Sequence, residues 1–363
     1  MRIYVLGTVY LLCCLCASAQ QIKHRMILFG DAGEINTDQS KLIDKAAELV
    51  LAGRTSTYFL GDNIYELGMN LPESGDSSVT ADILRHQYSP FTQKGVPVTF
   101  MAGNHDWDKS GERGLEKVIA QQEFLQKQQS PLLSFVPKAG TGDVFSVDLT
   151  DGLRLIFYDS EYWLFPHHQH PDSAVNGLVR ERFKDSLRAI ARHSGGKTLL
   201  VLSHHPMLSF GEHGKNFTLK DHIFPLTRLN QKLYVPLPVL GSIYPLLRER
   251  IISTPEDMSH KVYKRLIDDV QESLGGHSDI IYIAGHDHGL QYIEDGDFRQ
   301  IVSGAGSKRS YIQKNKKQKY RSNHQGFALL DVLADDSLRL SFYTALGQEL
   351  SLSYQTRLEK DHK

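Results

Sequence analysis

Cysteine is scarce in this chain, and its placement excludes one class of fold. Three of the 363 residues are cysteines, and all of them, Cys13, Cys14 and Cys16, lie near the N-terminus. The sequence after Ala19 therefore contains no cysteine and forms no disulfide bond. A small disulfide-stabilised domain is excluded, so the fold must depend on burial of a hydrophobic core.

A large excess of charge is also absent. The chain has 41 Lys and Arg against 42 Asp and Glu, with a formal net charge of -1. A near-neutral chain gives no argument for nucleic acid or an anionic membrane as a partner, so we expect no nucleic acid to bind. The local exception is the basic run from Ser307 to Arg321, which we expect to be a solvated loop because runs of like charge usually are.

The apolar run near the N-terminus is too short for a retained membrane anchor. It extends from Ile3 to about Ala17, whereas a helix that spans a bilayer needs ~20 apolar residues. Ala17-Ser18-Ala19 supplies the small residues that a signal peptidase requires. We therefore expect residues 1–19 to be a signal peptide cleaved near Ala19, and the protein to be exported, either secreted or periplasmic.

No linker rich in Pro, Gly or Ser and no internal repeat divides the remaining sequence. The simplest organisation is one α/β domain over residues 20–363. We expect it to contain an insert at about 216–278 and C-terminal strands at about 325–356. The apolar, proline-punctuated stretch 233–247 of the insert is expected to pack against the protein, and the alternative is a lid that makes weak contact with a membrane or a partner. The sequence leaves the oligomeric state open.

Apolar runs alternate with segments of helical periodicity over the first two thirds of the chain. Buried strands are predicted at 25–29, 55–60, 96–101, 198–202 and 280–284, and helices at 40–51, 115–128, 179–193 and 261–274. A hairpin is predicted at 144–149 and 153–158, and shorter strands at 291–293, 299–302, 328–332, 338–344 and 350–354. Strands that alternate with helices pair in parallel, and the later hairpins make the sheets mixed, so we predict an α/β sandwich.

Potential metal ligands occur in five short runs, four of which directly follow a predicted strand. The runs are Gly30 to Gly33, Gly61 to Tyr65, Gly103 to Asp106, Ser203 to Pro206 and Gly285 to His288. The carboxyl ends of neighbouring parallel strands meet at one edge of a sheet, so these residues should converge there. The candidate ligands are Asp31, Asp62, Tyr65, Asn104, His204, His286 and His288. They are enough to hold two metal ions, which favours a two-metal hydrolase.

The ligand types indicate two different sites. Asp62 has two carboxylate oxygens and is the natural bridge between the ions. Tyr65 lies three residues further on, and a phenol with a pKa near 10 becomes an anionic ligand only beside a strongly acidic ion, which favours ferric iron. Both aspartates, Tyr65 and one histidine would form that oxygen-rich site. Asp62, the Asn104 carbonyl and two histidines would suit zinc, manganese or ferrous iron.

These runs resemble a known family. Their order, Asp-x-Gly, Gly-Asp-x-x-Tyr, Gly-Asn-His-Asp, Val-x-x-His and Gly-His-x-His, is similar to that of the purple acid phosphatases of the calcineurin-like metallophosphoesterase superfamily. Gly33 stands where the general superfamily has a histidine, and Tyr65 is typical of the iron-containing branch. Glu212-His213-Gly214 and Ser303 to Gly306 extend the resemblance to the small tartrate-resistant acid phosphatases, over about residues 25–306. The fold that this implies is a four-layer αββα sandwich of two mixed sheets flanked by helices.

The resemblance also implies how the residues divide between the ions. Ferric iron would be bound by Asp31, Asp62, Tyr65 and His288, and a divalent ion (Fe, Zn or Mn) by Asp62, Asn104, His204 and His286. His105 and His213 would face the phosphate and the leaving oxygen without binding metal. The implied function is an exported acid phosphatase that hydrolyses small phosphate monoesters by attack of a metal-bound hydroxide, with His213 or His105 protonating the leaving group.

Two other functions stay open. A phosphodiesterase or nucleotide hydrolase would use the same metals with a different pocket. A non-catalytic exported iron-binding or interaction protein is the alternative from another class, and the intact His105 and His213 argue against it.

A further histidine cluster is suggestive of a third metal site. It consists of His167, His168 and His170. Because no acidic or cysteine partner is placed nearby, we expect a plain surface loop.

Overall fold

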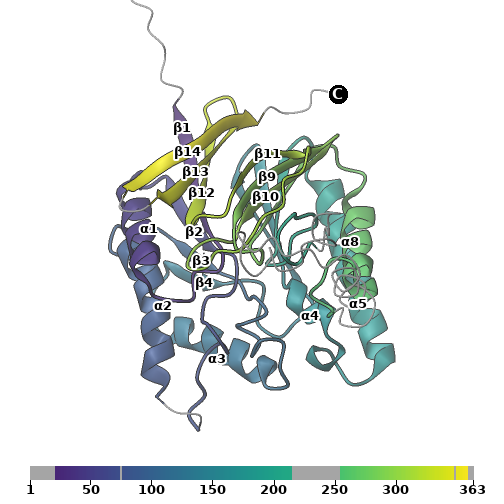
Figure 1. The fold of residues 1–363 in the computed structure, drawn as a ribbon. Helices are drawn as coiled ribbons and strands as arrows, with labels where there is room; N and C mark the ends of the chain where they lie inside the picture. The colour runs from purple at the N-terminus through teal and green to yellow at the C-terminus, as the bar shows by residue number, and fades with distance from the viewer. Residues whose placement is uncertain (1–20, 74–75, 215–253, 347–348, 359–363) are drawn as a thin grey trace, which may run out of the picture.

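Two seven-stranded mixed β-sheets form the centre of the molecule, and helices lie on their outer faces (Figure 1). The structure is a computed structural model, which describes residues 21–73, 76–214, 254–346 and 349–358. The expected signal peptide and the apolar stretch 233–247 lie outside these residues. Within the described ranges, no helix combines the length and the apolar character needed to cross a membrane.

The first sheet joins N-terminal and C-terminal strands. In spatial order it contains β14 (Glu349–Leu358), β13 (Leu338–Leu346), β12 (Gly326–Leu333), β1 (Ile22–Phe29), β2 (Thr55–Phe59), β3 (Val98–Phe100) and β4 (Leu133–Phe135). β1 pairs in parallel with β2 and antiparallel with β12. The strands from β1 to β4 are all parallel, so their carboxyl ends share one edge.

The second sheet has a parallel centre with antiparallel strands at both edges. In spatial order it contains β11 (Gln318–Ser322), β9 (Leu290–Asp295), β10 (Phe298–Ser303), β8 (Ile280–Ala284), β7 (Thr198–Leu202), β6 (Leu153–Tyr158) and β5 (Val144–Thr150). β6, β7, β8 and β10 run in parallel, whereas β5, β9 and β11 are antiparallel to their neighbours.

Helices cover the outer face of each sheet. They are α1 (Thr37–Glu48), α2 (Ser77–Thr92) and α3 (Gly114–Lys127) on one side, and α4 (Ser160–Leu164), the 3-10 turn η1 (Pro166–His168), α5 (Ser173–His193) and α8 (Lys261–Leu274) on the other (Figure 1). Ala46 of α1 and Leu84 of α2 pack in one core cluster with Phe29 of β1. Phe183 of α5 and Val270 of α8 pack with residues of β6 and β7. The predicted four-layer αββα sandwich is therefore confirmed.

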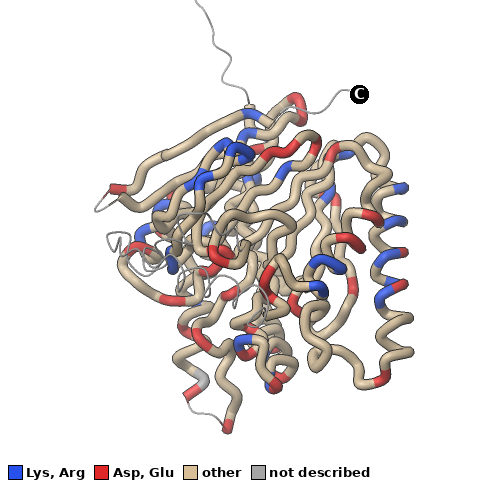
Figure 2. The backbone as a smooth tube through the Cα atoms, turned by 45° about the vertical axis from the view of Figure 1, so that its right-hand side comes forward, with Lys and Arg blue, Asp and Glu red and all other residues tan. Residues whose placement is uncertain are grey.

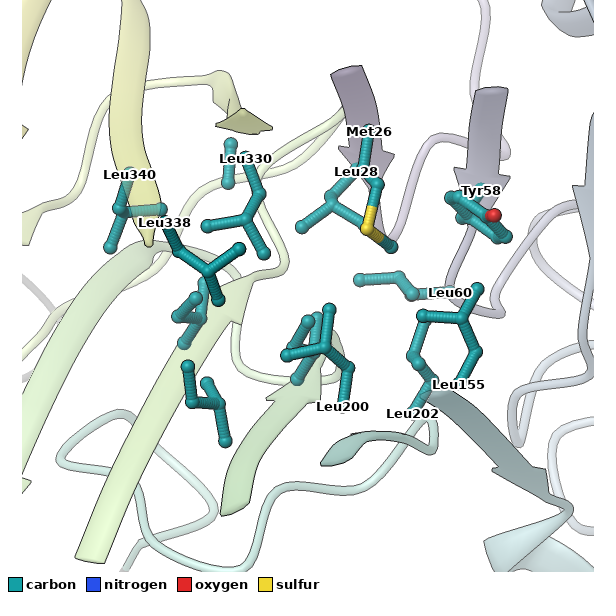
Figure 3. Close-up of a cluster of buried hydrophobic side chains, with 14 of the residues drawn as sticks. Met26, Leu28, Tyr58, Leu60, Leu155, Leu200, Leu202, Leu330, Leu338 and Leu340 are labelled. Carbon is teal, nitrogen blue, oxygen red and sulfur yellow. The ribbon is translucent and has the colours of Figure 1, made fainter. Parts of the chain in front are cut away.

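A third hydrophobic cluster fills the space between the two sheets (Figure 3). Met26 and Leu28 of β1 face it, and Leu200 and Leu202 of β7 approach from the opposite sheet. Ile27 and Phe29 of β1 point the other way, toward the helices. β1 is thus buried on both faces, which explains its continuous apolar sequence, and each such side chain contributes about 1.5–3 kcal/mol by leaving water.

Several predicted elements match the structure in both bounds, and others differ for a local reason. The strands at 198–202 and 280–284 and the helix at 261–274 are as predicted. The first helix begins at Thr37, before the predicted residue 40, because the Asn36 side chain caps it by accepting a hydrogen bond from the Gln39 amide at 2.9 Å. The basic run was expected to be a solvated loop, but its residues 318–321 belong to β11.

Ion pairs hold part of that basic run in place. Lys319 pairs with Glu294 at 3.2 Å, and Lys317 pairs with Asp295 at 2.5 Å. Figure 2 shows that basic and acidic residues are interspersed in this way over much of the described chain. Most of these pairs are exposed and each contributes about 0–1 kcal/mol to stability.

Candidate metal centre

Loops that follow parallel strands of both sheets bring the candidate ligands to one edge of the sandwich. The loops after β1, β2 and β3 carry Asp31, Asp62, Tyr65 and Asn104, and the loops after β7 and β8 carry His204, His286 and His288. Five of these seven residues are buried, whereas Tyr65 and His288 are partly exposed, and the His288 side chain is 24% exposed. The convergence that strand order predicts is therefore present.

Three of the seven residues have a left-handed backbone conformation. The φ angles are 58° at Asp31, 53° at Asp62 and 68° at His286. This conformation costs about 1–2 kcal/mol in a residue with a side chain, so it persists where surrounding contacts hold it. The Asp31 amide donates to the Gly61 carbonyl at 3.0 Å, and the His286 amide donates to Asp31 Oδ2 at 2.8 Å. The loops therefore hold one another in place.

The first group of side chains is rich in oxygen and centres on Tyr65. Its Oη lies 3.1 Å from Asp31 Oδ1 and 3.1 Å from Asp62 Oδ2. The same oxygen is 3.2 Å from His288 Nε2, which in turn lies 3.4 Å from Asp31 Oδ1. We refer to Asp31, Asp62, Tyr65 and His288 as the first group.

The second group contains two imidazole nitrogens and lies on the other side of Asp62. Asn104 Oδ1 is 3.0 Å from His204 Nε2 and 3.3 Å from His286 Nδ1. These two nitrogens are 3.3 Å apart, and His204 Nε2 is 3.4 Å from Asp62 Oδ1. We refer to Asp62, Asn104, His204 and His286 as the second group. Asp62 thus presents Oδ2 to the first group and Oδ1 to the second.

These separations fit the shells of two cations. Two atoms that each lie about 2.1 Å from one ion are about 3.0 Å apart at an octahedral angle and about 3.4 Å apart at a tetrahedral one. His204 Nδ1 donates to the Leu60 carbonyl at 2.9 Å, so in the neutral ring Nε2 presents a lone pair to the oxygen of Asn104. Metal-binding histidines commonly use their second nitrogen in this way. A cation would relieve the repulsion between these electron-rich atoms.

The charges of the first group also favour a cation. Burial, followed by the carboxylates of Asp31 and Asp62, raises the pKa of the Tyr65 phenol well above its ordinary value. Burial alone would raise the pKa of Asp62 too, but His204 and His105 more than offset it, and the net shift is downward. An ionised Tyr65 beside two carboxylates therefore requires a strongly charged ion.

His105 and His213 lie at the edges of the two groups. His105 Nδ1 donates to the Glu66 carbonyl at 2.6 Å, and its Nε2 is 3.9 Å from Asp62 Oδ2. The His213 ring packs on the His286 ring with their centres 4.0 Å apart, and the His213 amide donates to Asp287 Oδ1 at 3.0 Å. Both imidazoles are thus beside the candidate ligands.

Close packing explains why glycine occupies position 33. A Cβ atom added to Gly33 would lie 2.6 Å from the Ile64 amide nitrogen, 2.7 Å from the Asn63 carbonyl carbon and 2.7 Å from the Asp62 carbonyl oxygen. A histidine therefore does not fit there with this backbone. Gly103 is equally confined, because its added Cβ would lie 2.4 Å from both the amide nitrogen and Oδ1 of Asp62.

Asp106 supports the loops from below without facing the candidate ligands. Its carboxylate accepts hydrogen bonds from the Gly103 amide at 2.8 Å, the Asn63 amide at 3.0 Å and the Asn63 side chain at 3.0 Å. Burial, and then the nearby charge of Asp62, raises the pKa of Asp106 to about 8. Asp106 therefore connects the loop after β2 to the loop after β3. The Gly-Asn-His-Asp motif alone did not predict this structural role.

The expectation for the histidine cluster at 167–170 is wrong for one of its members. His167 and His170 are exposed, but His168 is buried, with its ring stacked on Trp107 at a centre distance of 4.4 Å. An acidic partner is present as well, because Glu161 Oε1 lies 3.6 Å from His168 Nδ1. The buried His205, which directly follows His204, lies on the other side of Glu161. The adjacent pair His204-His205 is visible in the sequence, but only His204 was predicted to belong to a site.

The comparisons with known proteins agree with this geometry. A family model described as calcineurin-like phosphoesterase matches residues 24–290. The chain therefore belongs to the calcineurin-like phosphoesterase family. Within it, the chain is similar to purple acid phosphatases, which are hydrolases of this superfamily with a dinuclear metal site. Purple acid phosphatase 3 of Arabidopsis thaliana is 25% identical over 307 residues, which cover 80% of this chain and 65% of that protein.

A second plant relative and two solved structures show the same likeness. Purple acid phosphatase 17 of Arabidopsis thaliana is 24% identical over 306 residues, covering 80% of this chain and 71% of that protein. The purple acid phosphatase PPD1 of yellow lupin aligns with a TM-score of 0.52 at 14% identity, over 93% of this chain and 54% of that one. GAP50, described as the anchor in the inner membrane complex of Plasmodium, aligns with a TM-score of 0.58 at 16% identity, over 94% and 90%. At these identities the structures show a shared fold.

Proposed function

We propose that this protein is an exported phosphatase that hydrolyses small phosphate monoesters at a centre of two metal ions. The observation that carries the proposal is the position of Asp62 between two groups of ligand atoms, one rich in oxygen and one with two imidazoles. When bound, two cations would polarise the phosphate oxygens and lower the pKa of water. This is the chemistry that phosphate ester hydrolysis requires.

The first group is proposed to hold ferric iron, and the second a divalent ion such as iron, zinc or manganese. The phenol of Tyr65 lies within 3.2 Å of three other candidate ligand atoms, and an anionic phenolate suits a trivalent ion. The second group offers two nitrogens and two oxygens, which is the mixed ligand set that zinc, manganese and ferrous iron accept. His286 Nδ1 faces Asn104 Oδ1 and His204 Nε2, and the buried Nε2 has no hydrogen-bond partner among the described residues. With the proton of the neutral ring on Nε2, the lone pair of Nδ1 would be directed at the ion.

His105 and His213 are proposed to act on the substrate. The carbonyl of Glu66 fixes the proton on His105 Nδ1, so protonation of Nε2 would give a second donor directed at the first group. His213 packs against the second group. One imidazole would stabilise the phosphate and the other would protonate the leaving oxygen, work that contributes about 10²- to 10⁴-fold in rate.

Metal analysis of three variants, combined with a panel of phosphoesters, tests this proposal. Asp62→Asn should lose both ions, Asn104→Ala mainly the divalent ion and His288→Ala mainly the ferric ion, because each group is weakened separately. The control is His167→Ala, an exposed histidine that is not among the seven candidate ligands. Equal loss of both ions in all three variants would show that the partition is wrong.

The substrate panel separates the remaining functions. A monoesterase should hydrolyse phosphate monoesters faster than diesters and nucleotides, and the reverse order would favour a phosphodiesterase or nucleotide hydrolase. GAP50 is described as an anchor, so a non-catalytic interaction protein is the other class to test. An iron-loaded protein without turnover on any ester would support that class.

Export and domain organisation are part of the proposal. We propose that a signal peptide, residues 1–19, is removed and that residues 20–363 form one domain. N-terminal sequencing of the secreted or periplasmic protein should begin close to Gln20. An intact N-terminus on a protein retained in the cytoplasm would contradict export.

A further inference from the structure

Asp287 is a buried carboxylate that lies between His286 and His288 in the chain. It is 0% exposed, and its Oδ1 accepts a hydrogen bond from the His213 amide at 3.0 Å. Asp287 follows β8, whereas His213 follows β7, and 74 positions separate the two residues. The contact therefore joins the loop that carries two candidate ligands to the loop that carries His213.

The loop before His213 packs directly on the Asp287 side chain. A Cβ atom added to Gly211 would lie 2.4 Å from Asp287 Cγ and 2.5 Å from Asp287 Oδ1, whereas ordinary contacts begin near 3.4 Å. The carboxylate thus occupies the space that a side chain at position 211 would need. The hydrogen bond and the close packing are two separate observations that place Asp287 against this loop.

Further hydrogen bonds fix the backbone around His213. The Phe210 amide donates to Gln291 Oε1 at 3.1 Å, and Gln291 Nε2 donates to Ser209 Oγ at 2.8 Å. The Met258 amide donates to the His213 carbonyl at 3.2 Å. Both backbone polar groups of His213 are therefore bound, the N–H group by Asp287 and the carbonyl by Met258.

The position of the His213 ring depends on this backbone. The ring centre lies 4.0 Å from that of the His286 ring, at an interplanar angle of 40°. His213 is partly exposed, so close packing does not surround the ring on all sides. A shift of the loop away from Asp287 would therefore carry the imidazole away from the second group.

We propose that Asp287 is a positioning residue, which holds the loop of His213 so that this imidazole stays over the second group. This role rests on the proposed function, because it matters for turnover only if His213 acts on the substrate. A displacement of about 1 Å at a reacting centre can lower the rate about 10²-fold. Loss of the Asp287 contact should thus impair turnover through His213, without removing a ligand atom of either group.

A purely structural contact is the competing interpretation. Oδ2 of Asp287 is buried and has no hydrogen-bond partner among the described residues, so the acceptor Oδ1 is the atom that holds the loop. Asparagine has a side-chain oxygen that can accept the same hydrogen bond, whereas alanine has none. Asp287→Asn should therefore retain most of the function, and Asp287→Ala should lose it.

Kinetics of the metal-loaded full-length protein test whether Asp287 acts through His213. We expect Asp287→Ala to lower kcat/KM by about 10- to 100-fold and to show the same preference between alkyl and p-nitrophenyl phosphates as His213→Ala. Because both changes remove one function, the double variant should be no slower than His213→Ala alone. Metal content should equal that of the wild type. The control is Asp44→Ala, an exposed aspartate of α1, which should not differ from the wild type.

Two results of these kinetics would overturn the proposal. If the losses in Asp287→Ala and His213→Ala multiply in the double variant, the two residues act independently. If Asp287→Ala loses metal, the carboxylate serves the metal centre and not His213. Equal activity of Asp287→Asn and Asp287→Ala would likewise show that the acceptor at Oδ1 has no such role.

Hydrogen exchange of the His213 amide is a second measurement, and it needs no turnover. The amide should be protected in the wild type and in Asp287→Asn, and should exchange faster in Asp287→Ala, where the acceptor is missing. Gly211→Ala perturbs the same contact from the other side and keeps the carboxylate. It should also speed exchange of this amide, so the test does not depend on the folding of Asp287→Ala.

The two measurements separate failure of this proposal from failure of the proposed function. Unchanged exchange in both Asp287→Ala and Gly211→Ala would overturn the positioning role even in an active phosphatase. Faster exchange in a protein that hydrolyses no phosphate ester would confirm that Asp287 holds the loop, but would exclude the catalytic purpose proposed for it.

Discussion

An informative single perturbation of the candidate centre is the addition of one methyl group at Gly33. Its Cβ would lie 2.6 Å from the Ile64 amide nitrogen, whereas ordinary contacts begin near 3.4 Å. The difference, 3.4 minus 2.6, requires a shift of about 0.8 Å, and all three close contacts are with backbone atoms, which cannot rotate away. The loop that must move carries Asp62 and Tyr65, so Gly33→Ala changes the geometry of both groups at once.

The expected magnitudes follow from this shift. Overpacking of a buried site costs about 1–3 kcal/mol of stability, and a displacement of about 1 Å at a reacting centre can lower the rate by about 10²-fold. We expect Gly33→Ala to lower kcat/KM for a phosphate monoester by about 10- to 100-fold and to weaken metal retention. The assays are steady-state kinetics, thermal unfolding and metal content per chain.

Gly177→Ala is the matched control for Gly33→Ala. Gly177 lies inside α5, and an added Cβ has nothing within 4 Å. Alanine in the interior of a helix is more stable than glycine by about 0.5–1 kcal/mol, so this variant should be slightly stabilised with unchanged kinetics. The reasoning would be refuted if Gly33→Ala kept the metal content and kcat/KM of the wild type.

Three further predictions concern single residues of the centre. Tyr65→Phe should abolish the violet absorption band expected of a ferric phenolate while the fold is retained, and a colourless, active protein with only zinc or manganese would exclude the iron assignment. His213→Ala should slow alkyl phosphates much more than p-nitrophenyl phosphate, whose leaving group needs little protonation, and a uniform loss would transfer the acid role to His105. Asp106→Ala leaves three buried donors without their acceptor, so unfolding by urea should show a loss of about 3–5 kcal/mol, and a loss under about 1 kcal/mol would contradict its role.

Strand order made the gathering of the candidate ligands predictable from sequence. Apolar runs such as 198–202 and 280–284 are buried on both faces, and the residues after parallel strands must share an edge. The division of the candidate ligands into two groups was predicted from the ligand chemistry of Asp62 and Tyr65. Their role as ligands is still a prediction, which the metal analysis above tests.

Short elements and contacts between distant segments could not be predicted in the same way. β4 has three residues, Leu133–Phe135, too few for a periodic signal. β11 was not predicted because it lies within a basic run. It is an edge strand, and its charged side chains pair with neighbouring residues on the outside of the sheet. The burial of His168 depends on Trp107, a contact between two loops that local sequence does not encode.

The position of β1 between β2 and β12 has a consequence for the order of assembly. Arg25 of β1 and Asp331 of β12 form an ion pair at 2.7 Å although 306 positions separate them in the chain. During synthesis, one edge of β1 therefore has no strand partner until nearly the whole polypeptide has been made. Contacts between residues so far apart in the sequence form slowly. Until β12 arrives, Met26 and Leu28 lack part of their cover. A nascent chain halted before residue 326 would thus expose an unpaired edge of β1 and would be prone to aggregation.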